Sequence, residues 1–198
     1  GSTHVKDDWR NTRTLLMLLD VNGDIVWSKT FAVGKWGRGT SLALSPDGNL
    51  VVALDAADDA TSQSHPGILK ISTDTGEILW EKYFSIPDAI EFENIIQVAD
   101  GGFVVMAQRR DAPVLAIEGM SIIFKIDTNG NVVWEKTLAD SQHIMCCAVA
   151  ENSNGEIYAT GFHSKVTGVP LVLIKLTANG DLVWNKTCSD VYANHISI

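Results

Sequence analysis

The sequence predicts an all-β protein built from copies of one unit about fifty residues long. The first observation is a motif that occurs four times, in which Trp follows Gly by four positions and Lys follows Trp by two. Its tryptophans are Trp27, Trp80, Trp134 and Trp184, so the steps are 53, 54 and 50 residues. The second observation is that no stretch of useful length has helical periodicity. A repeat of this size is typical of stacked or radially arranged units.

Each copy of the motif predicts a hairpin. A short apolar run comes first, such as residues 122–126, and a run without alternation is typical of a strand covered on both faces. The turn that follows is Asn-Gly in three copies and Thr75-Gly76 in the other. Asn-Gly is the strongest signal for a two-residue hairpin, because both central residues need positive φ. The strand after the turn carries the Trp and the Lys.

A second hairpin follows each of the first three tryptophans. Its strands and Gly turn lie at 42–53, 96–107 and 148–159. Each unit therefore holds four strands, which we name A to D in chain order. The prolines favour these boundaries, because each falls in or beside an expected connection, where a missing N–H costs no ladder bond: Pro46, Pro66, Pro87, Pro113 and Pro170.

The units organise residues 1–198 as a single domain. Complete units are expected at about 41–84, 94–138 and 143–188. The chain opens on a C–D hairpin at 14–31 and closes on an expected A strand at 195–198. One unit is therefore split between the termini, and a short strand at 3–5 could supply part of its missing B strand. The array is either a small closed ring of about four units or part of a larger one.

Four-stranded units at this spacing are typical of the blades of a β-propeller. The motif resembles the tryptophan-docking motif of the pyrroloquinoline-quinone-like propellers. It is still more similar to the repeats of bacterial surface and secreted propeller proteins, in segments 100–105 and 125–137. The resemblance covers about residues 14–198 and implies a propeller outside the cytosol, in the periplasm, on the cell surface as a lipoprotein, or secreted. It implies no particular function, because one fold hosts many.

The four repeated tryptophans are expected to be structural, docked between neighbouring blades, because they share one register in every copy. A Trp buries a large apolar area there while its N–H reaches a backbone acceptor. The alternative is a stacking platform for sugars. The lysines that follow them, such as Lys29 and Lys136, are expected to guard the exposed edge of the outermost strand against pairing with another chain.

Composition excludes several partner classes. The net charge of −9 makes nucleic acid and anionic membrane surfaces poor partners. No apolar run reaches the roughly 18 residues that a membrane-spanning helix needs. The three cysteines do not repeat with the unit, so they do not form a disulfide framework.

Contact residues are expected on the face where the D–A and B–C loops gather, because loops on a rigid scaffold are where binding residues concentrate. The B–C loops at 56–67, 108–121 and 162–170 are long and do not repeat. The expected loop-face residues, all aromatic or cationic or histidine, are Trp36, Arg38, His65, Arg109, Arg110 and His163.

No catalytic, cofactor-binding or metal-ligating residue is predicted, because the histidines and cysteines lie at no such spacing. In some quinone-dependent propeller enzymes adjacent cysteines form a disulfide beside the cofactor, which is the reading that the resemblance suggests for Cys146 and Cys147. The alternative is that both are small packing residues of an inner strand.

The leading hypothesis for function is a non-catalytic binding or scaffold propeller, with a protein or glycan ligand on the loop face. A second hypothesis is a structural unit that closes a larger propeller by homodimerisation. A third is a fragment of a propeller enzyme whose chemistry involves a quinone or a glycan.

Overall fold

The fold is all-β in a computed structural model that describes residues 2–5, 8–31, 36–57, 66–84, 90–109, 120–138, 144–163 and 170–188. These residues contain fifteen strands and no helix. None of them therefore forms a helix that could cross a membrane.

The strands form four antiparallel sheets, each a meander in which consecutive strands are neighbours. The first sheet has three strands: β1 (Ser2–Val5), β2 (Asp8–Leu19) and β3 (Ile25–Phe31). The second is β4 (Trp36–Leu44), β5 (Leu50–Ala57), β6 (Gly67–Ile71) and β7 (Ile78–Tyr83). The third is β8 (Ile90–Gln97), β9 (Phe103–Arg109), β10 (Met120–Ile126) and β11 (Val132–Leu138). The fourth is β12 (Ile144–Glu151), β13 (Ile157–His163), β14 (Leu171–Leu176) and β15 (Leu182–Cys188).

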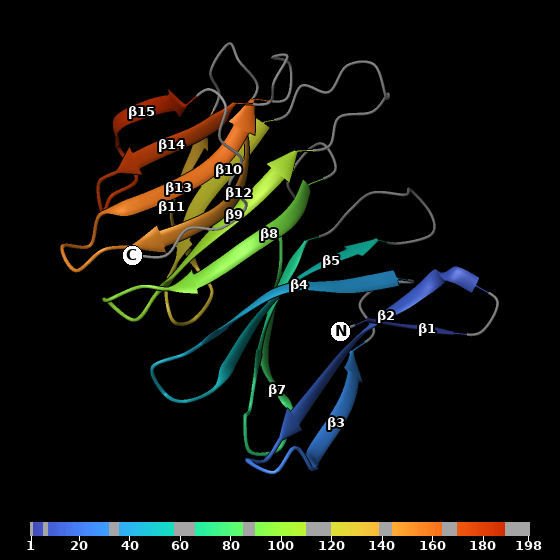
Figure 1. Cartoon of the computed structure of the whole chain (residues 1–198). Helices are drawn as coiled ribbons and strands as arrows, with labels where there is room; N and C mark the ends of the chain where they lie inside the picture. The colour runs from blue at the N-terminus through green and yellow to red at the C-terminus, as the bar shows by residue number, and fades with distance from the viewer. Residues whose placement is uncertain are drawn as a thin grey trace.

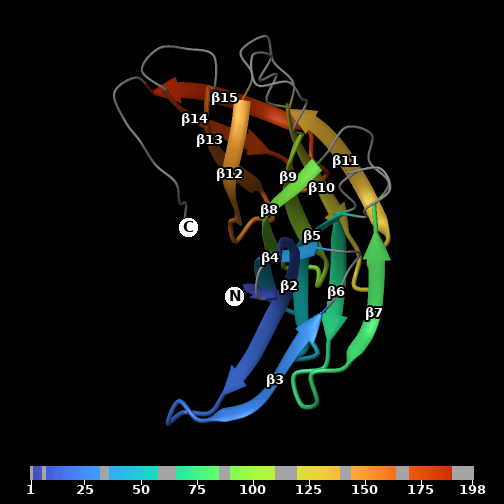
Figure 2. The same cartoon turned by 90° about the vertical axis from the view of Figure 1, so that its right-hand side faces the viewer.

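The four sheets follow one another in a curved row, with the first and last at opposite ends (Figures 1 and 2). The first strands of consecutive sheets, β4, β8 and β12, contact one another along the inside of the curve. Tight turns that contain Gly join strands at one end of every sheet. The connections from one sheet to the next, and those from β5 to β6, β9 to β10 and β13 to β14, leave from the other end. This is the arrangement of propeller blades, in which loops of one kind share one face.

The observed boundaries differ from the expected ones mainly at the inner strands. β4 and β8 begin at Trp36 and Ile90, a few residues before the expected starts at 41 and 94. They are longer because their first residues still pair with the following strand, Trp36 with Ala57 and Ile90 with Arg109, and the ladder continues past a β-bulge in each. At the N-terminus β1 pairs with β2 in the position of a second strand. The expected strand at 195–198 lies outside the described residues.

The hairpin turns have a longer loop than the two-residue form that Asn-Gly predicts. In the third sheet the N–H of Asp127 donates to the carbonyl of Asn131 at 2.9 Å, and the N–H of Gly130 donates to the carbonyl of Asp127 at 3.1 Å. The carboxylate of Asp127 also accepts from the N–H groups of Asn129 and Asn131. The loop is therefore three residues closed by a side-chain cap, with Gly130 at φ 79°.

Three apolar clusters form the core, and each lies between two consecutive sheets. Leu16 and Phe31 of the first sheet pack on Leu69 and Ile71 of the second. The cluster between the second and third sheets contains Phe92 and Phe124, and the one between the third and fourth contains Met106 and Ile174. The contact between sheets, rather than the interior of any one sheet, is therefore where apolar burial holds the fold together.

Candidate functional site

Three of the four repeated tryptophans lie at the contacts between sheets, which we call seams. Each packs against the turn glycine of the next sheet's outer hairpin: Trp27 on Gly76, Trp80 on Gly130 and Trp134 on Gly180. The indole Nε1 of Trp27 donates to the carbonyl of Thr73 at 2.7 Å, and that of Trp134 donates to the carbonyl of Ala178 at 3.1 Å. A Cβ at Gly180 would lie 2.7 Å from Cε3 of Trp134, so the glycine is required for the close approach.

The lysines after these tryptophans also reach across the seams. Lys29 pairs with Glu77, and Lys136 pairs with Asp181 at 2.9 Å. In both pairs the acid directly follows the turn glycine. The expectation that these lysines guard a free strand edge therefore misses their contact, because the neighbouring turn supplies a carboxylate within reach.

The inner strands carry a feature that was not predicted from the sequence. β4, β8 and β12 each contain a bulge, at Thr40, Glu93 and Cys147. All three residues precede the Gly of the following turn by eight positions, so the bulges are equivalent. A bulge takes a residue out of the ladder and re-aims its side chain, and bulges are common beside functional sites.

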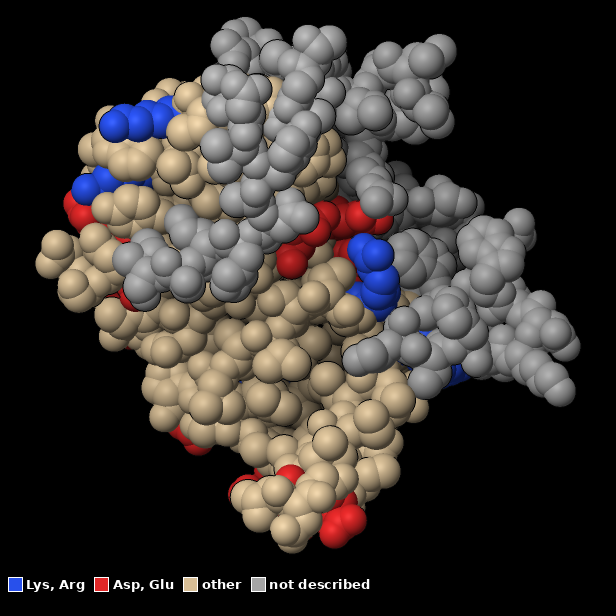
Figure 3. All heavy atoms as spheres, viewed as in Figure 1, with Lys and Arg blue, Asp and Glu red and all other residues tan. Residues whose placement is uncertain are grey.

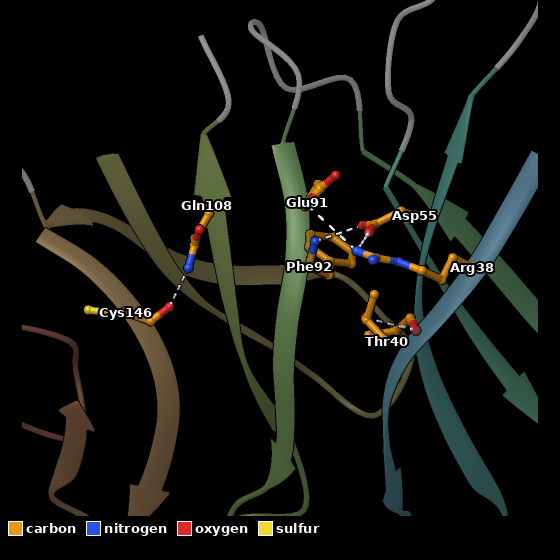
Figure 4. A network of polar contacts seen from close by, with 8 residues as sticks. Arg38, Thr40, Asp55, Glu91, Phe92, Gln108 and Cys146 are labelled. Carbon is orange, nitrogen blue, oxygen red and sulfur yellow. Dashed lines mark hydrogen bonds and ion pairs between the residues drawn. The ribbon is translucent and has the colours of Figure 1, made fainter. Parts of the chain in front are cut away.

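A polar cluster lies beside these bulges at the seam between the second and third sheets (Figure 4). The guanidinium of Arg38 on β4 lies 3.1 Å from the Asp55 carboxylate and 3.6 Å from that of Glu91 on β8. The other oxygen of Asp55 accepts from the N–H of Phe92 at 2.7 Å. The Asp55 side chain is fully buried, whereas 49% of the Arg38 side chain is exposed. Arg38 is therefore the part of the cluster that a partner can reach.

Burial decides the acidity of Asp55. Loss of solvation raises its pKa to about 6, against the opposing effects of the Phe92 N–H and the Arg38 guanidinium. Glu91 adds a smaller effect in the raising direction. Both carboxylate oxygens are used within the fold, so Asp55 joins two sheets and positions Arg38 rather than facing a ligand.

At the next seam a neutral side chain makes the equivalent hydrogen bond to the inner strand of the following sheet. Gln108 stands at the position of Asp55, seven residues after the turn glycine. Its Nε2 donates to the carbonyl of Cys146 on β12 at 2.9 Å (Figure 4). Ser121 accepts from the N–H of Cys146 at 2.7 Å. The inner strands are thus held at the bulge by side chains of the preceding sheet.

Cys146, Cys147 and Cys188, all among the described residues, form no disulfide. Cys146 is fully buried in the apolar cluster between the third and fourth sheets. Burial raises the pKa of the half-buried Cys147 thiol, and the charge of Glu93 raises it further. The thiol therefore stays protonated at neutral pH and is a weak nucleophile.

Of the other expected loop-face residues, the structure describes the side chain of His163 alone. His163 is buried, and its Nε2 lies 3.1 Å from Oγ1 of Thr187 in the fourth sheet. Trp36 and Arg109 begin β4 and end β9, and their side chains are not described. His65 and Arg110 lie outside the described residues. The described part of the chain brings no three His, Cys, Asp or Glu side chains together as metal ligands.

Charged atoms of both signs meet at one place on the inner side. Figure 3 shows acidic and basic atoms side by side near the middle of this face, with largely uncharged surface below them.

The polar cluster around Arg38 has a sequence signal, which is the distance to the following turn glycine. Arg38 and Glu91 each precede the turn glycine of their own hairpin by ten residues. Aligning the copies on that glycine would have placed the two side chains at one level.

Comparison with known proteins gives a fold. No family model matches the sequence, and no curated protein matches it. A neuraminidase-like protein of subtype N10 from A/little yellow-shouldered bat/Guatemala/060/2010 is similar in structure, with a TM-score of 0.59 and 16% identity. The match covers 89% of this chain and 50% of that chain, so this chain spans half the length of that propeller. The likeness is one of propeller-like fold.

Two further solved structures match less well. A protein of unknown function from Bacteroides caccae has a TM-score of 0.37 and 15% identity, covering 91% of this chain and 75% of that chain. A eukaryotic initiation factor has a TM-score of 0.29 and 10% identity, covering 98% of this chain and 66% of that chain.

Proposed function

We propose that this chain is a non-catalytic binding scaffold, with four blades of a tryptophan-docking propeller that present a protein or glycan site around Arg38. The observation that carries the proposal is the set of equivalent bulges at Thr40, Glu93 and Cys147, which re-aim side chains along the inner strands beside a half-exposed guanidinium. The seam geometry of the tryptophans supports the propeller assignment.

The chemistry of the cluster favours binding over catalysis. A general base must reach a substrate proton, but the buried Asp55 has both oxygens engaged by the fold. Cys147 has a raised pKa, and His163 is buried against Thr187. These three groups are therefore poor candidates for a base or a nucleophile.

Arg38 supplies what a polar ligand needs. A guanidinium has five N–H donors in a fixed fork, and the contacts described with Asp55 and Glu91 both involve its Nη2. Such donors on a half-exposed side chain suit carbonyl or hydroxyl oxygens of a peptide or sugar. The neighbouring carboxylates of Asp55 and Glu91 disfavour strongly anionic ligands.

A binding screen tests this proposal. The full chain is applied to a glycan array and to a peptide library, and hits are measured by calorimetry. The double variant Arg38→Ala/Asp55→Asn removes the guanidinium without leaving a buried unpaired charge. We expect it to weaken binding by about tenfold or more, the equivalent of one charged hydrogen bond. The control Lys136→Ala removes a comparably exposed cation from the outer strand and should leave binding unchanged.

No ligand in either screen, or equal binding by the double variant and the wild type, would overturn the proposal. We also propose a location outside the cytosol of a bacterium, which the resemblance to surface and secreted repeat proteins supports. Recovery of the native protein in the cytosolic fraction of its host cell would contradict this location.

A further inference from the structure

The three seams between described sheets show which contacts a sheet makes with each neighbour. The first and fourth sheets each have such a neighbour on one side. In each described seam, an apolar face receives the preceding sheet and a turn glycine receives its Trp, and in two of the three an acid after that glycine receives its Lys. The first sheet has an apolar face, a turn glycine and an acid like those that receive the Trp and Lys, which we call the receiving half of a seam. The fourth sheet has the Trp and Lys, which we call the donating half.

The receiving half is uncovered on the first sheet. Met17 and Leu19 are 51% and 48% exposed, whereas Ile174 and Leu176 at the same positions of the fourth sheet are 2% and 0% exposed. A Cβ at Gly23 would meet no atom within 4 Å, unlike the glycines of the other three outer turns. Over the lower part of the molecule, where Figure 1 places β2 and β3, Figure 3 shows mostly uncharged atoms, with acidic atoms at the lowest edge.

The donating half is present on the fourth sheet. The described contacts of the Trp184 ring are with its own sheet: Tyr158 lies edge-on with centroids 6.2 Å apart, and Lys186 Nζ lies 5.2 Å from the ring centroid. Lys186 holds the position of Lys29 and Lys136, and Asp24 holds that of Glu77 and Asp181. Charge and shape therefore match between the fourth sheet and the first.

These halves do not meet within one chain, because the first and fourth sheets lie at opposite ends of the row (Figures 1 and 2). We propose that a second copy of this chain provides the match. Trp184 of each copy docks on the Gly23 turn of the other, with its Nε1 donating to the carbonyl of Val21 and Lys186 paired with Asp24. A two-fold axis forms both seams at once, so the assembly closes as a dimer.

The positions in the first sheet match those of the seam between the third and fourth sheets. Val21 stands at the turn position of Ala178, whose carbonyl accepts from Trp134, and it is fully exposed. The inference does not depend on the proposed ligand site, which lies on inner strands away from both end faces. Failure of dimerisation would therefore leave the binding proposal standing, and the reverse also holds.

Sedimentation of the full chain over a wide concentration range tests the dimer. We expect a monomer–dimer equilibrium, in which Trp184→Ala raises the dissociation constant by about 30-fold or more, as for a buried aromatic hot spot. Lys186→Asp and Asp24→Lys should each weaken the dimer, and combining them should restore it, since both seams regain an opposite-charge pair. The control Glu135→Lys makes the same charge change as Asp24→Lys on an exposed site of β11 and should have no effect.

Two results would overturn the proposal. One is a monomer at every concentration, and shielding of Trp184 from a fluorescence quencher in that monomer would indicate closure within the chain. The other is a dimer that Trp184→Ala and the charge variants leave unchanged. A dimer that the single charge variants weaken and the combined variant restores would establish the seam between copies.

Discussion

Gly180→Ala tests the seam between the third and fourth sheets, and Gly48→Ala is its matched control. Both glycines have φ of 80° and occupy tight turns. A Cβ at Gly48 would meet no atom within 4 Å, whereas one at Gly180 would lie 2.7 Å and 2.8 Å from Cε3 and Cζ3 of Trp134. The two substitutions therefore share a backbone cost and differ only in contact with the indole.

The magnitudes follow from these distances. Placing Ala in the left-handed region costs roughly 1–2 kcal/mol in either variant. The overlap with Trp134 cannot be relieved by a flexible side-chain end, because rigid ring carbons are involved. Overpacking of this kind costs roughly 1–3 kcal/mol more. We expect Gly180→Ala to lose this additional amount of unfolding free energy relative to Gly48→Ala.

Urea unfolding followed by circular dichroism measures the difference. The same pair is then made in a Trp134→Ala background, where the ring is absent and the excess cost should disappear, as in a double-mutant cycle. Equal losses for Gly180→Ala and Gly48→Ala in the wild-type background would refute the docking of Trp134 on this turn. If Gly180→Ala still costs more unfolding free energy than Gly48→Ala when Trp134 is absent, the additional cost does not come from contact with the indole.

Three further predictions concern single side chains. Because the pKa of Asp55 is raised from 3.8 to about 6, the folded state binds its proton more tightly, and this group lowers stability as pH rises through that window. Asp55→Asn should therefore gain up to about 3 kcal/mol relative to wild type between pH 4 and 6 in urea unfolding, and a constant difference would contradict the raised pKa. Cys147 should react with a thiol reagent more slowly than free cysteine at pH 8, with the phase assigned by Cys147→Ser; a faster reaction would contradict the account. Lys136→Ala should lower the free energy of unfolding by less than about 1 kcal/mol, because the pair of Lys136 with Asp181 is solvent-exposed. A larger loss, measured by thermal unfolding, would contradict the assignment of this pair as a weak surface interaction.

The repeat predicts most of the strand pattern because its signals are local. The apolar runs, the turn glycines and the tryptophan register each depend on a few neighbouring residues. The docking of Trp27 on Gly76 follows from the same spacing, because a ring in identical register needs an identical partner in the next unit. This part of the fold can therefore be predicted from the amino-acid sequence alone.

The inner bulges could not be read from residue type. Thr40, Glu93 and Cys147 have nothing in common chemically, and an extra residue in a ladder depends on pairing with the neighbouring strand. Arg38 was expected at the loop face, but its partners were not. Asp55 and Glu91 come from two different sheets, so only the packing of those sheets brings them to it.

A crystal structure of the full chain, read at the four repeated indoles, tests the central claim most directly. The account predicts Trp27, Trp80 and Trp134 each seated on the turn glycine of the next sheet, and Trp184 seated on the Gly23 turn of a second copy. Indoles that point into solvent, away from any neighbouring turn, would contradict it.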